Sequence, residues 1–387
     1  MDEGGSGDLT ATSFNDLPAD VVMDILSRLP AKTLIRFSSV RKSFHSLIRT
    51  PIFIAKHLHF HSSNTSHLLI VPPNLSSGNP CSLLCDSDTN TRQATFDLPL
   101  KTKTPTAEVI GSSNGLVCIA DRFGLRQAVY LWNPSIRRYK TLPPSCFSEQ
   151  LRHWSTYAVI GFGFCEFDSD YRVVRVVYCP DDCGNFMGKV KPEVEVYSLK
   201  KDSWSKVAGI VVPRIAESGS VAFANGGVHW LAAKKILTAF EVILAFDLKD
   251  EVFRELGLPK KLVKVFEERA MGLVSFGIKE FGGSLSLFVN CFPRDESCSV
   301  WWMKEYGNAK SWTKQFTVVL PHGKVDRVFV FTKSGKIIAE TYDRKLVSYD
   351  PEKKNVQDIV LGDGRFGALG TFTESLVMLE RRKRTFF

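Results

Sequence analysis

Nine cysteines are the residues of this chain best suited to metal binding or redox chemistry. The closest pairs, Cys81 with Cys85 and Cys179 with Cys183, each have three intervening residues. Structural zinc sites need two close pairs of ligands at recognisable spacing. Because these pairs lie far apart along the chain and no histidine follows at zinc-finger spacing, we predict reduced thiols and no metal site.

His57, His59 and His61 form a second group of metal-ligating side chains. On a strand, alternating residues point to one face, so the three imidazoles would lie together. The surrounding residues also allow a helix, and no carboxylate stands beside the histidines in the sequence. The segment is therefore predicted to hold no metal ion.

Sequence signatures of catalysis are few. The chain has no phosphate loop of the Walker type and no His-Glu-x-x-His motif. The Gly161–Gly163 segment lacks the third glycine and the following helix of a dinucleotide site, so it predicts a tightly packed strand. Asp168 with Asp170, and Asp181 with Asp182, lie in turn-like sequence, where aspartate is expected to hydrogen-bond to the backbone. We therefore expect no enzyme activity and no cofactor.

The stretch from residue 16 to residue 49 has the spacing of three short amphipathic helices. Apolar residues recur on one side of the first helix, and Pro30 ends it before the second begins. Thr50 and Pro51 end the third. So small a bundle buries little core by itself. Its apolar faces are expected to contact a partner protein or, in the plainer alternative, the rest of the same chain.

Beyond about residue 60, short apolar runs separated by Gly, Asn, Asp and Pro predict an all-β domain. A hairpin-like unit recurs, in which an apolar strand ends at a polar turn residue before a returning strand. These turn residues follow one another at intervals of 47, 65, 49, 57 and 46 residues, and they are Asp86, Asn133, Ser198, Asp247, Lys304 and Asp350. Such repeats are typical of propeller blades, so the hairpins predict the outer strands of a β-propeller with about six blades. A β-sandwich with chance hairpins is the alternative.

Other segments of this region fit the interior of a propeller. Segments with a Gly turn before an apolar strand are expected to supply inner strands: GSSNGLVCIA, FANGGVHWLA and FGGSLSLFV. The stretch from Leu262 to Arg269 is the one candidate helix of the region. Tryptophans stand at equivalent points of the strand pairs, where we expect structural packing between blades: Trp132, Trp204, Trp230, Trp302 and Trp312.

The N-terminal stretch DLPADVVMDILSRLPAKTLIRFSSVRKSF resembles an F-box, with its leucines, prolines and basic positions in register. F-boxes dock on a Skp-type adaptor, which links them to a cullin scaffold. The resemblance implies ten adaptor contacts, which are Leu17, Pro18, Val21, Ile25, Leu26, Pro30, Leu34, Phe37, Val40 and Phe44.

Two positions depart from the F-box pattern. Plant members usually carry Trp where Phe44 stands, and a small residue is common where Arg41 stands. Phenylalanine keeps most of the buried area but lacks the indole N–H. We therefore expect the same docking mode with an altered affinity for the adaptor.

The β region resembles the plant F-box-associated domain, which is related to kelch-type propellers. The matching segments, in order, are NGLVCI, WNPSIRRYKTLP, GFGF with YRVVRV, VEVYSLKKDSW, VHWLA and WMKEYGNAKSWTK. Within this family, the chain is most similar to the constitutive expresser of pathogenesis-related genes group. Together the resemblances imply a non-catalytic substrate receptor of an SCF-type ubiquitin ligase, with an immune receptor as an implied target. The alternative is a propeller that binds proteins or glycans outside a ubiquitin ligase.

Contacts with a protein substrate are expected in long turns between strands. The candidate loops are residues 145–154, 179–191, 213–218 and 293–297. The residues singled out in them are Ser145, Asp181, Asp182, Arg214 and Arg294.

The net charge of +9 is concentrated near the two ends of the chain. Residues 14–60 hold seven basic and three acidic side chains, and Arg381–Arg384 add four basic ones. The segment between them shows no basic stripe, which argues against nucleic acid and favours an acidic protein partner. The basic tail is either a nuclear-import patch or a solvated end.

No apolar run reaches the roughly 18 residues of a membrane span, and residues 1–13 lack a signal-peptide pattern. We therefore expect no membrane insertion and a location in cytoplasm and nucleus. The predicted organisation is a disordered N-terminus (1–13), an F-box (14–58), a propeller-like domain (59–379) and a basic tail (380–387).

Overall fold

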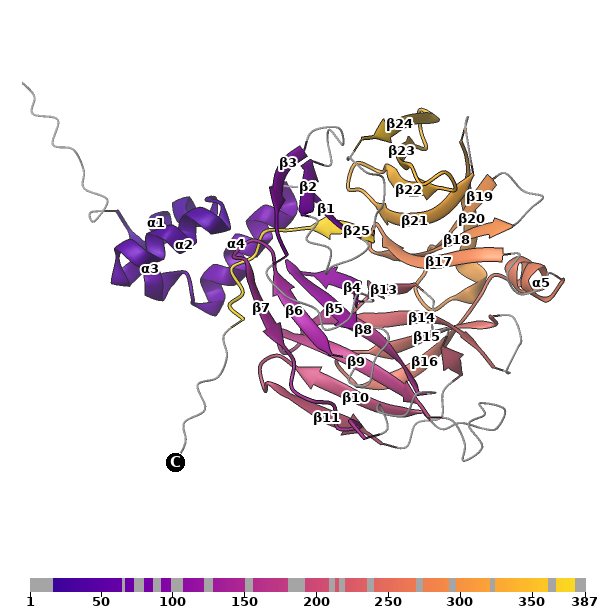
Figure 1. Ribbon diagram of the computed structural model, residues 1–387, viewed down its shortest axis with the longest axis horizontal. Helices are drawn as coiled ribbons and strands as arrows, with labels where there is room; N and C mark the ends of the chain where they lie inside the picture. Colours follow the sequence, from indigo (N-terminus) through magenta and orange to yellow (C-terminus); the bar gives the residue numbers. More distant parts are fainter. Residues whose placement is uncertain are drawn as a thin grey trace, which may run out of the picture.

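A computed structural model shows four N-terminal helices followed by a ring of sheets (Figure 1). The residues that the structure describes are 17–64, 67–72, 80–85, 92–98, 107–121, 128–149, 156–179, 192–208, 213–215, 220–234, 240–268, 274–291, 297–320, 324–360 and 367–379.

The helical part has one helix more than the sequence predicted. Its elements are α1 (Ala19–Ser27), α2 (Ala31–Val40), α3 (Lys42–Leu47) and α4 (Pro51–Asn64). Thr50 and Pro51 end the third helix and also begin the fourth. The Thr50 hydroxyl accepts a hydrogen bond from the Phe53 N–H at 3.3 Å, and proline suits a first helical position. Helix α4 crosses the predicted boundary at residues 58 and 59, and the first strand begins at His67.

The first three sheets have four antiparallel strands each, which run in order from the inner to the outer strand. The first contains β25 (Ala368–Phe372), β1 (His67–Val71), β2 (Cys81–Cys85) and β3 (Arg92–Phe96). The second contains β4 (Ala107–Ser113), β5 (Leu116–Asp121), β6 (Val129–Asn133) and β7 (Arg138–Thr141). The third contains β8 (Tyr157–Cys165), β9 (Asp170–Tyr178), β10 (Glu193–Ser198) and β11 (Ser203–Val207).

The remaining sheets continue the same order. In the fourth, β12 (Arg214–Ile215) and β13 (Val221–Ala224) both pair with β14 (Gly227–Ala233), followed by β15 (Val242–Asp247) and β16 (Val252–Gly257). The fifth contains β17 (Val274–Phe281), β18 (Ser284–Cys291), β19 (Ser297–Met303) and β20 (Trp312–Val319). The sixth contains β21 (Val325–Phe331), β22 (Ile337–Thr341), β23 (Leu346–Asp350) and β24 (Asn355–Ile359). Helix α5 (Lys260–Glu268), near the predicted 262–269 helix, follows β16, and a short 3-10 helix, η3 (Ala309–Ser311), precedes β20.

The sheets close into a six-bladed propeller, as predicted. The inner strands of neighbouring blades contact one another around the ring, which is drawn face-on in Figure 1. Closure joins the two ends of the domain: β25 pairs with β1, with Leu69 opposite Gly370. Each pair of adjacent blades encloses one apolar cluster, so the core is divided among the interfaces between blades.

Two kinds of turn repeat around the ring, on a face that we term the hairpin-turn face. Inner hairpins use two positive-φ residues, Asn114–Gly115, Asn225–Gly226 and Gly282–Gly283, as a type I′ turn requires. Outer hairpins instead end in one positive-φ residue, four places after each of four predicted turn markers: Arg137, Asp202, Glu251 and Lys354. Because strands alternate in direction, the connections after β7 and β9 lie on the opposite face, which we term the long-connection face.

Tight packing between the third and fourth blades explains the Gly161–Gly163 segment. A Cβ on Gly161 would overlap Trp230, and one on Gly163 would overlap Phe223. Trp230 is only 1% exposed, and its indole N–H donates to the Ile160 carbonyl at 3.4 Å. The prediction of a tightly packed strand is confirmed.

Three further tryptophans also join blades, whereas the ring contact of Trp302 is with Phe281 of its own blade, at 5.5 Å between centres. The Trp204 indole donates to the Pro143 carbonyl at 2.9 Å, and the Trp312 indole donates to the Gly257 carbonyl at 2.9 Å. In both cases the acceptor follows or ends the outer strand of the preceding blade. Trp132 is fully buried between the first two blades. The predicted structural role is confirmed for these side chains.

Candidate functional site

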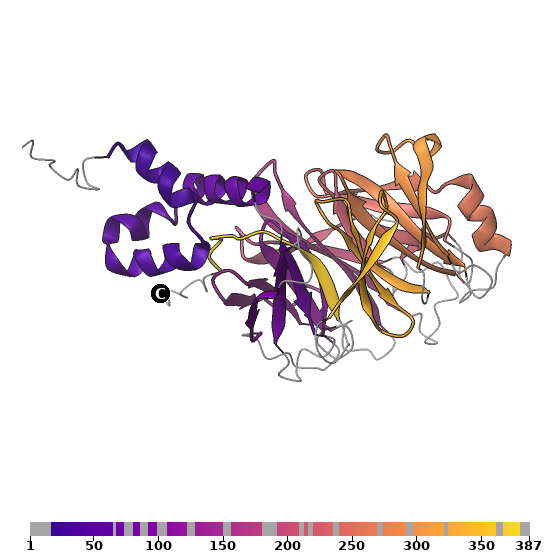
Figure 2. The same cartoon turned by 90° about the horizontal axis from the view of Figure 1, so that it is seen from above.

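The ten residues predicted to bind a partner divide by exposure. Helices α1–α3 extend beyond the rim of the ring in both views (Figures 1 and 2). Four large apolar side chains on α1 and α2 are exposed, and we term them the docking surface. Their exposed fractions are 38% for Val21, 42% for Ile25, 37% for Phe37 and 82% for Val40. Pro18 and Pro30 are also exposed. Exposed apolar groups gathered on so small a bundle are typical of a protein interaction site.

The other predicted contacts lie deeper. Leu26 and Leu34 are 2% and 0% exposed and form the core of the helical bundle, where Leu376 from the C-terminal end joins them. Leu17 and Phe44 are half-buried. The structure shows a packing role for Leu26 and Leu34, and their contact with a partner stays a prediction.

The two positions that depart from the F-box pattern contact each other. The Arg41 guanidinium lies 5.6 Å from the centre of the Phe44 ring, and the Phe44 ring lies 6.3 Å from that of Phe37. A cation–π contact at an exposed site contributes about 0.5–1 kcal/mol. Arg41 therefore helps to hold Phe44 beside the docking surface.

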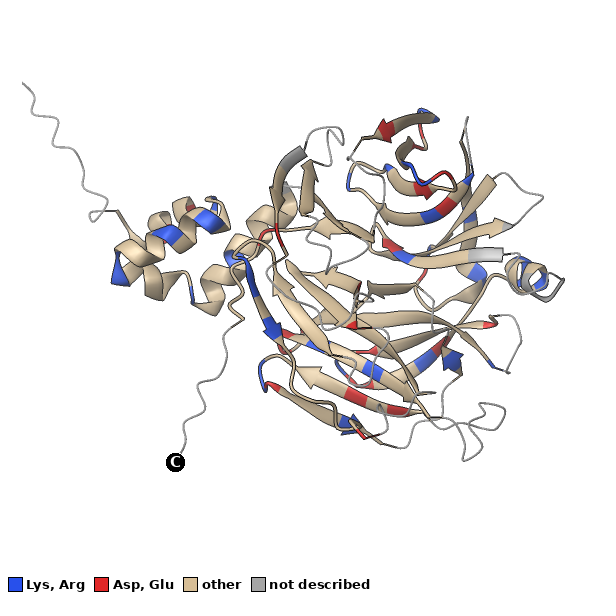
Figure 3. Ribbon diagram, viewed as in Figure 1, with Lys and Arg blue, Asp and Glu red and all other residues tan. Residues whose placement is uncertain are grey.

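Basic side chains surround the docking surface. Lys32, Arg36, Arg41 and Lys42 are all exposed on α2, α3 and the joint between them, and Figure 3 shows blue patches along these helices. Complementary charge speeds association and suppresses wrong partners. The helical bundle therefore suits an apolar surface with an acidic rim.

Residues 373–379, which we term the C-terminal strap, join the helices to the propeller. Leu376 enters the helical core, while the Asn133 side-chain amide donates to the carbonyls of Ser375 and Val377, both at 3.0 Å. The Glu374 carboxylate accepts the Ala31 N–H at 2.8 Å, at the start of α2. The docking surface is thus fixed relative to the propeller.

His57, His61 and Glu374 form the candidate metal-ligand cluster in the described residues, with ligand atoms within 4.8 Å of one another. Helix α4 places His57 and His61 on one face and leaves His59 exposed, unlike the strand alternative. The Nε2–H groups of His57 and His61 donate to the Leu29 carbonyl at 3.1 and 3.3 Å. These groups already bond to the turn between α1 and α2, so the cluster acts as a joint between helices and strap.

Acidification is expected to weaken the fold through this joint. Burial, aided by the neighbouring His61, lowers the pKa of His57 from its ordinary 6.5 to about 4. The unfolded chain therefore takes up a proton below about pH 6.5 that the folded chain accepts only near pH 4. Stability is full above pH 6.5, and His57 accounts for a loss of about 3 kcal/mol as the pH falls to 4.

Thermal unfolding measured from about pH 7.5 to pH 4 checks this dependence. Burial also lowers the pKa of His229 to about 4, so His229 contributes a similar loss of stability on acidification. His57→Gln should therefore remove about half of the pH-dependent loss of stability. His59→Gln alters an exposed imidazole on the same helix and should leave the loss unchanged. An equal pH dependence in wild type and His57→Gln would contradict the assignment.

The predicted substrate-contact residues that are described, Ser145 and Arg214, lie at the long-connection face. The Ser145 hydroxyl donates to the Glu195 carboxylate at 2.6 Å. The Arg214 side chain donates from Nε to the Tyr157 hydroxyl at 2.9 Å. Asp181, Asp182 and Arg294 lie outside the described residues. Contact between any of these residues and a substrate stays a prediction.

A buried ion pair supports the Ser145 loop from below. Arg175 and Glu195 face each other at 2.7 Å with side chains 3% and 0% exposed. The Glu195 carboxylate also accepts the Cys146 N–H at 2.7 Å, and the Arg175 guanidinium lies 4.5 Å from the Trp204 ring centre. Sequence reasoning missed this pair because its members lie on different strands.

The described acidic and serine motifs have structural partners. Asp170 accepts the Lys200 N–H at 3.0 Å, the backbone bond predicted for it, whereas Asp168 accepts from the Arg172 guanidinium side chain at 2.5 Å. Residues 111–115 spell Gly-x-Ser-x-Gly, the sequence pattern of a hydrolase nucleophile elbow. They form the hairpin between β4 and β5, whereas a hydrolase elbow joins a strand to a helix.

None of the helices in the described part of the chain combines the length and apolar character needed to span a bilayer.

Two domain families match this chain over the helical part and the propeller. Residues 14–56 match the F-box domain, and residues 76–372 match the F-box associated beta propeller domain. The chain is 33% identical over 368 residues to F-box protein CPR1 of Arabidopsis thaliana, covering 90% of this chain and 85% of that protein. It is 26% identical over 397 residues to F-box protein At3g07870 of the same plant, covering 90% and 88%. A solved chain in a nidogen/laminin complex gives a TM-score of 0.44 at 11% identity, covering 81% of this chain and all of that one.

Proposed function

Because the chain belongs to the F-box proteins that carry an F-box associated beta propeller domain, we propose that it is the substrate receptor of an SCF-type ubiquitin ligase. In this role α1–α3 bind a Skp-type adaptor, which connects the chain to a cullin scaffold. The propeller binds a target protein, which is then ubiquitinated and degraded.

The exposed docking surface is the observation that carries the proposal. Val21, Ile25, Phe37 and Val40 keep between 37% and 82% of their surface exposed in the isolated chain. Complete burial of a fully exposed side chain of this kind contributes about 1.5–3 kcal/mol, so burying the exposed part of Val21, Ile25 or Phe37 contributes about 1 kcal/mol each. The same bundle already has its own core around Leu26 and Leu34, so these four side chains are available to a partner.

The position of the helices supports separate binding sites for the adaptor and the target. The strap and the Asn114–Gly115 turn meet on the hairpin-turn face, where Gly115 lies against Thr373 and Ser375. Strand β25 ends on that face, and α4 enters β1 from it, so neither the strap nor α4 covers the long-connection face, where we propose that the target binds. A rigid joint between adaptor and target sites holds a bound lysine near charged ubiquitin, and proximity then supplies the rate enhancement. No residue of this chain needs to perform chemistry.

The target class and the cellular location extend this proposal. We propose an immune receptor as the first target to test, since that is the class implied by the sequence resemblance. We also propose that the chain works in the cytoplasm and the nucleus. Fluorescent tagging of the full chain checks the location, and a signal confined to another compartment would contradict it.

Co-purification of the tagged full chain tests the ligase assignment. With the proteasome inhibited, wild type should retain a Skp-type adaptor and a cullin. A double variant, Leu17→Ala with Pro18→Ala, should lose most of both, because these residues begin the predicted adaptor contact. Failure of wild type to retain the adaptor would overturn the proposal and favour a propeller that binds proteins or glycans outside a ubiquitin ligase.

A further inference from the structure

A cavity of about 680 Å³ occupies the centre of the propeller. Inner strands from all six blades contribute to its walls, among them β4, β17, β21 and β25. Its size falls within the roughly 300–1,000 Å³ of small-molecule sites. Its lining includes Ala107, where β4 begins, and Gly367, which precedes β25. Both strands begin on the long-connection face, so the cavity extends toward that face.

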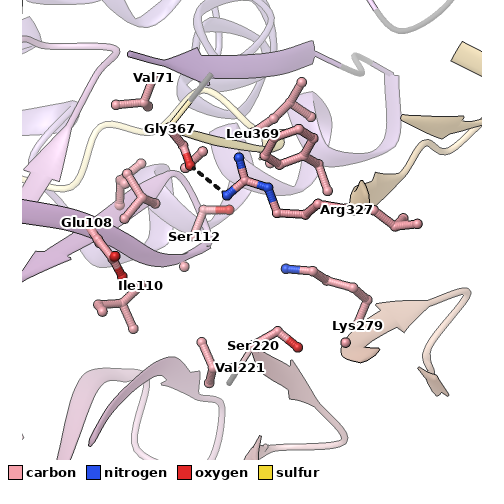
Figure 4. Close-up of a pocket in the computed structure, with 18 of the residues that line it drawn as sticks. Val71, Glu108, Ile110, Ser112, Ser220, Val221, Lys279, Arg327, Gly367 and Leu369 are labelled. Carbon is pink, nitrogen blue, oxygen red and sulfur yellow. Dashed lines mark hydrogen bonds between the residues drawn. The ribbon is translucent and has the colours of Figure 1, made fainter. Parts of the chain in front are cut away.

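Lys279 on β17 extends its ammonium group into this cavity (Figure 4). No side chain or carbonyl among the described residues accepts a hydrogen bond from its Nζ. Burial, with a smaller effect of Arg327, lowers the pKa of Lys279 to about 8. The Lys279 side chain is half-buried, and withdrawing an ammonium group from water is costly without a partner. An anionic ligand group in the cavity would offset that cost, and none of the ion pairs in the described part of the chain involves Lys279.

The neighbouring cations differ from Lys279 because acidic groups already balance them. Arg327 pairs with Glu340 at 2.8 Å, and Arg344 lies 3.3 Å from both Glu340 and Asp326. These two arginines and two carboxylates form a closed network on the β21–β22 side of the cavity.

Arg327 is held in a fixed orientation toward the cavity. Its guanidinium donates to the Gly367 carbonyl at 3.3 Å, drawn as a dashed line in Figure 4. It also lies 4.2 Å from the centre of the Phe329 ring. A guanidinium ordered by three partners loses little further freedom when it contacts a ligand.

The polar side chains on the other walls are satisfied by the protein. The Ser112 hydroxyl donates to the Thr371 carbonyl at 3.0 Å. The Ser220 hydroxyl accepts the Ile278 N–H at 2.6 Å. Glu108 lies on the wall opposite Lys279 (Figure 4). Among the charged groups of the lining, Lys279 is the cation that lies outside the Arg327–Arg344 network, while Glu108 and Asp121 are carboxylates elsewhere in the lining.

We propose that the central cavity binds a small anionic molecule through a carboxylate or phosphate group, with Lys279 as its counter-ion and Arg327 as a second, oriented donor. The ligand would lie beneath the face proposed to capture the target. Binding itself requires neither adaptor nor target, so this inference and the ligase assignment can fail independently.

Isothermal titration calorimetry on the purified full chain tests the proposal at constant ionic strength. Citrate probes a carboxylate ligand, inorganic phosphate probes a phosphate ligand, and glycerol serves as an uncharged control. We expect one anion to bind at a single site and glycerol not to bind. Heat equal to that of a sodium chloride blank for both anions would overturn the proposal.

Variants separate a ligand-binding role from a structural one. Lys279→Met keeps the aliphatic stem and should weaken anion binding at least about tenfold, whereas Lys279→Arg keeps the charge and should retain binding. Lys314→Met removes an exposed charge on β20 of the same blade and should bind like wild type. Equal anion affinity in wild type and a folded Lys279→Met variant would also overturn the proposal.

The pH dependence of citrate binding gives a second readout. Wild-type affinity should fall between about pH 7 and pH 9.5 as the Lys279 ammonium loses its proton. The other charged groups of the lining are carboxylates and guanidinium groups, namely Glu108, Asp121, Asp326, Arg327 and Arg344. Lys279→Arg should bind equally across this pH range. Loss of affinity with pH in that variant would contradict the assignment to Lys279.

Discussion

Replacing Ile25 with Asp is expected to reduce affinity for the Skp-type adaptor by about 100-fold or more. Ile25 is 42% exposed on α1, in line with Val21 one turn earlier, so its side chain is free to be buried by a partner. Because only the exposed part of Ile25 is buried on docking, losing that contact costs about 1 kcal/mol, and burying an unpaired carboxylate costs several times more. Each 1.4 kcal/mol is a factor of ten in affinity. Surface plasmon resonance with immobilised adaptor measures the change.

The free chain should tolerate the Ile25→Asp substitution, because the position is exposed before docking. Its thermal unfolding midpoint should stay close to that of wild type. Val360 offers a matched control, since it is an apolar side chain 85% exposed just after the last strand of the sixth blade. Val360→Asp should bind the adaptor like wild type. Normal adaptor binding by Ile25→Asp would place the interface elsewhere on the bundle.

Replacing Glu195 with Ala is expected to destabilise the propeller by about 3–5 kcal/mol. The carboxylate is fully buried and accepts hydrogen bonds from Arg175, Ser145 and Cys146. Its removal leaves the buried Arg175 charge uncompensated, which is the costly way to break a buried ion pair. At roughly 2 °C per kcal/mol for a chain of this size, the thermal midpoint should fall by about 6–10 °C.

A second glutamate tests whether burial is the cause. Glu255 on β16 pairs with Lys234 at 2.8 Å, but the two side chains are 44% and 48% exposed. Exposed pairs contribute about 0–1 kcal/mol, so Glu255→Ala should lower the midpoint by no more than about 2 °C. Burial is not the cause if the two variants melt at the same temperature. Glu195→Gln keeps the shape and should lie between Glu195→Ala and wild type.

Local patterns predicted much of the fold. The turn markers Asn133, Ser198, Asp247 and Asp350 each begin an outer hairpin whose geometry depends on nearby residues. Asp247, for example, accepts the Lys249 N–H at 2.9 Å, a bond between residues two places apart. Such contacts need no distant partner, so the sequence reveals them. The same reasoning would have found α4 from Thr50 followed by Pro51 at its first position.

The candidate site was predictable only in part. Amphipathic spacing indicated apolar positions on α1 and α2, and Val21, Ile25, Phe37 and Val40 are indeed exposed. The same spacing could not separate them from Leu26 and Leu34, which pack inside the bundle. Which of these apolar side chains is buried depends on where α4 and the strap pack against the bundle. Those packing contacts join residues that are far apart in the sequence.

The sequence alone determined the helical bundle, the hairpin repeat and the family, because helix periodicity and turn chemistry are encoded within a few neighbouring residues. Only the tertiary structure decided which distant groups meet: β25 closes the ring on β1, Glu374 joins His57 and His61, and Lys279 faces a cavity bounded by Arg327. The physical reason is that a local sequence pattern does not specify which strand edge pairs with which, or which carboxylate meets which cation. Those contacts join residues far apart in the chain and are fixed only when the ring closes.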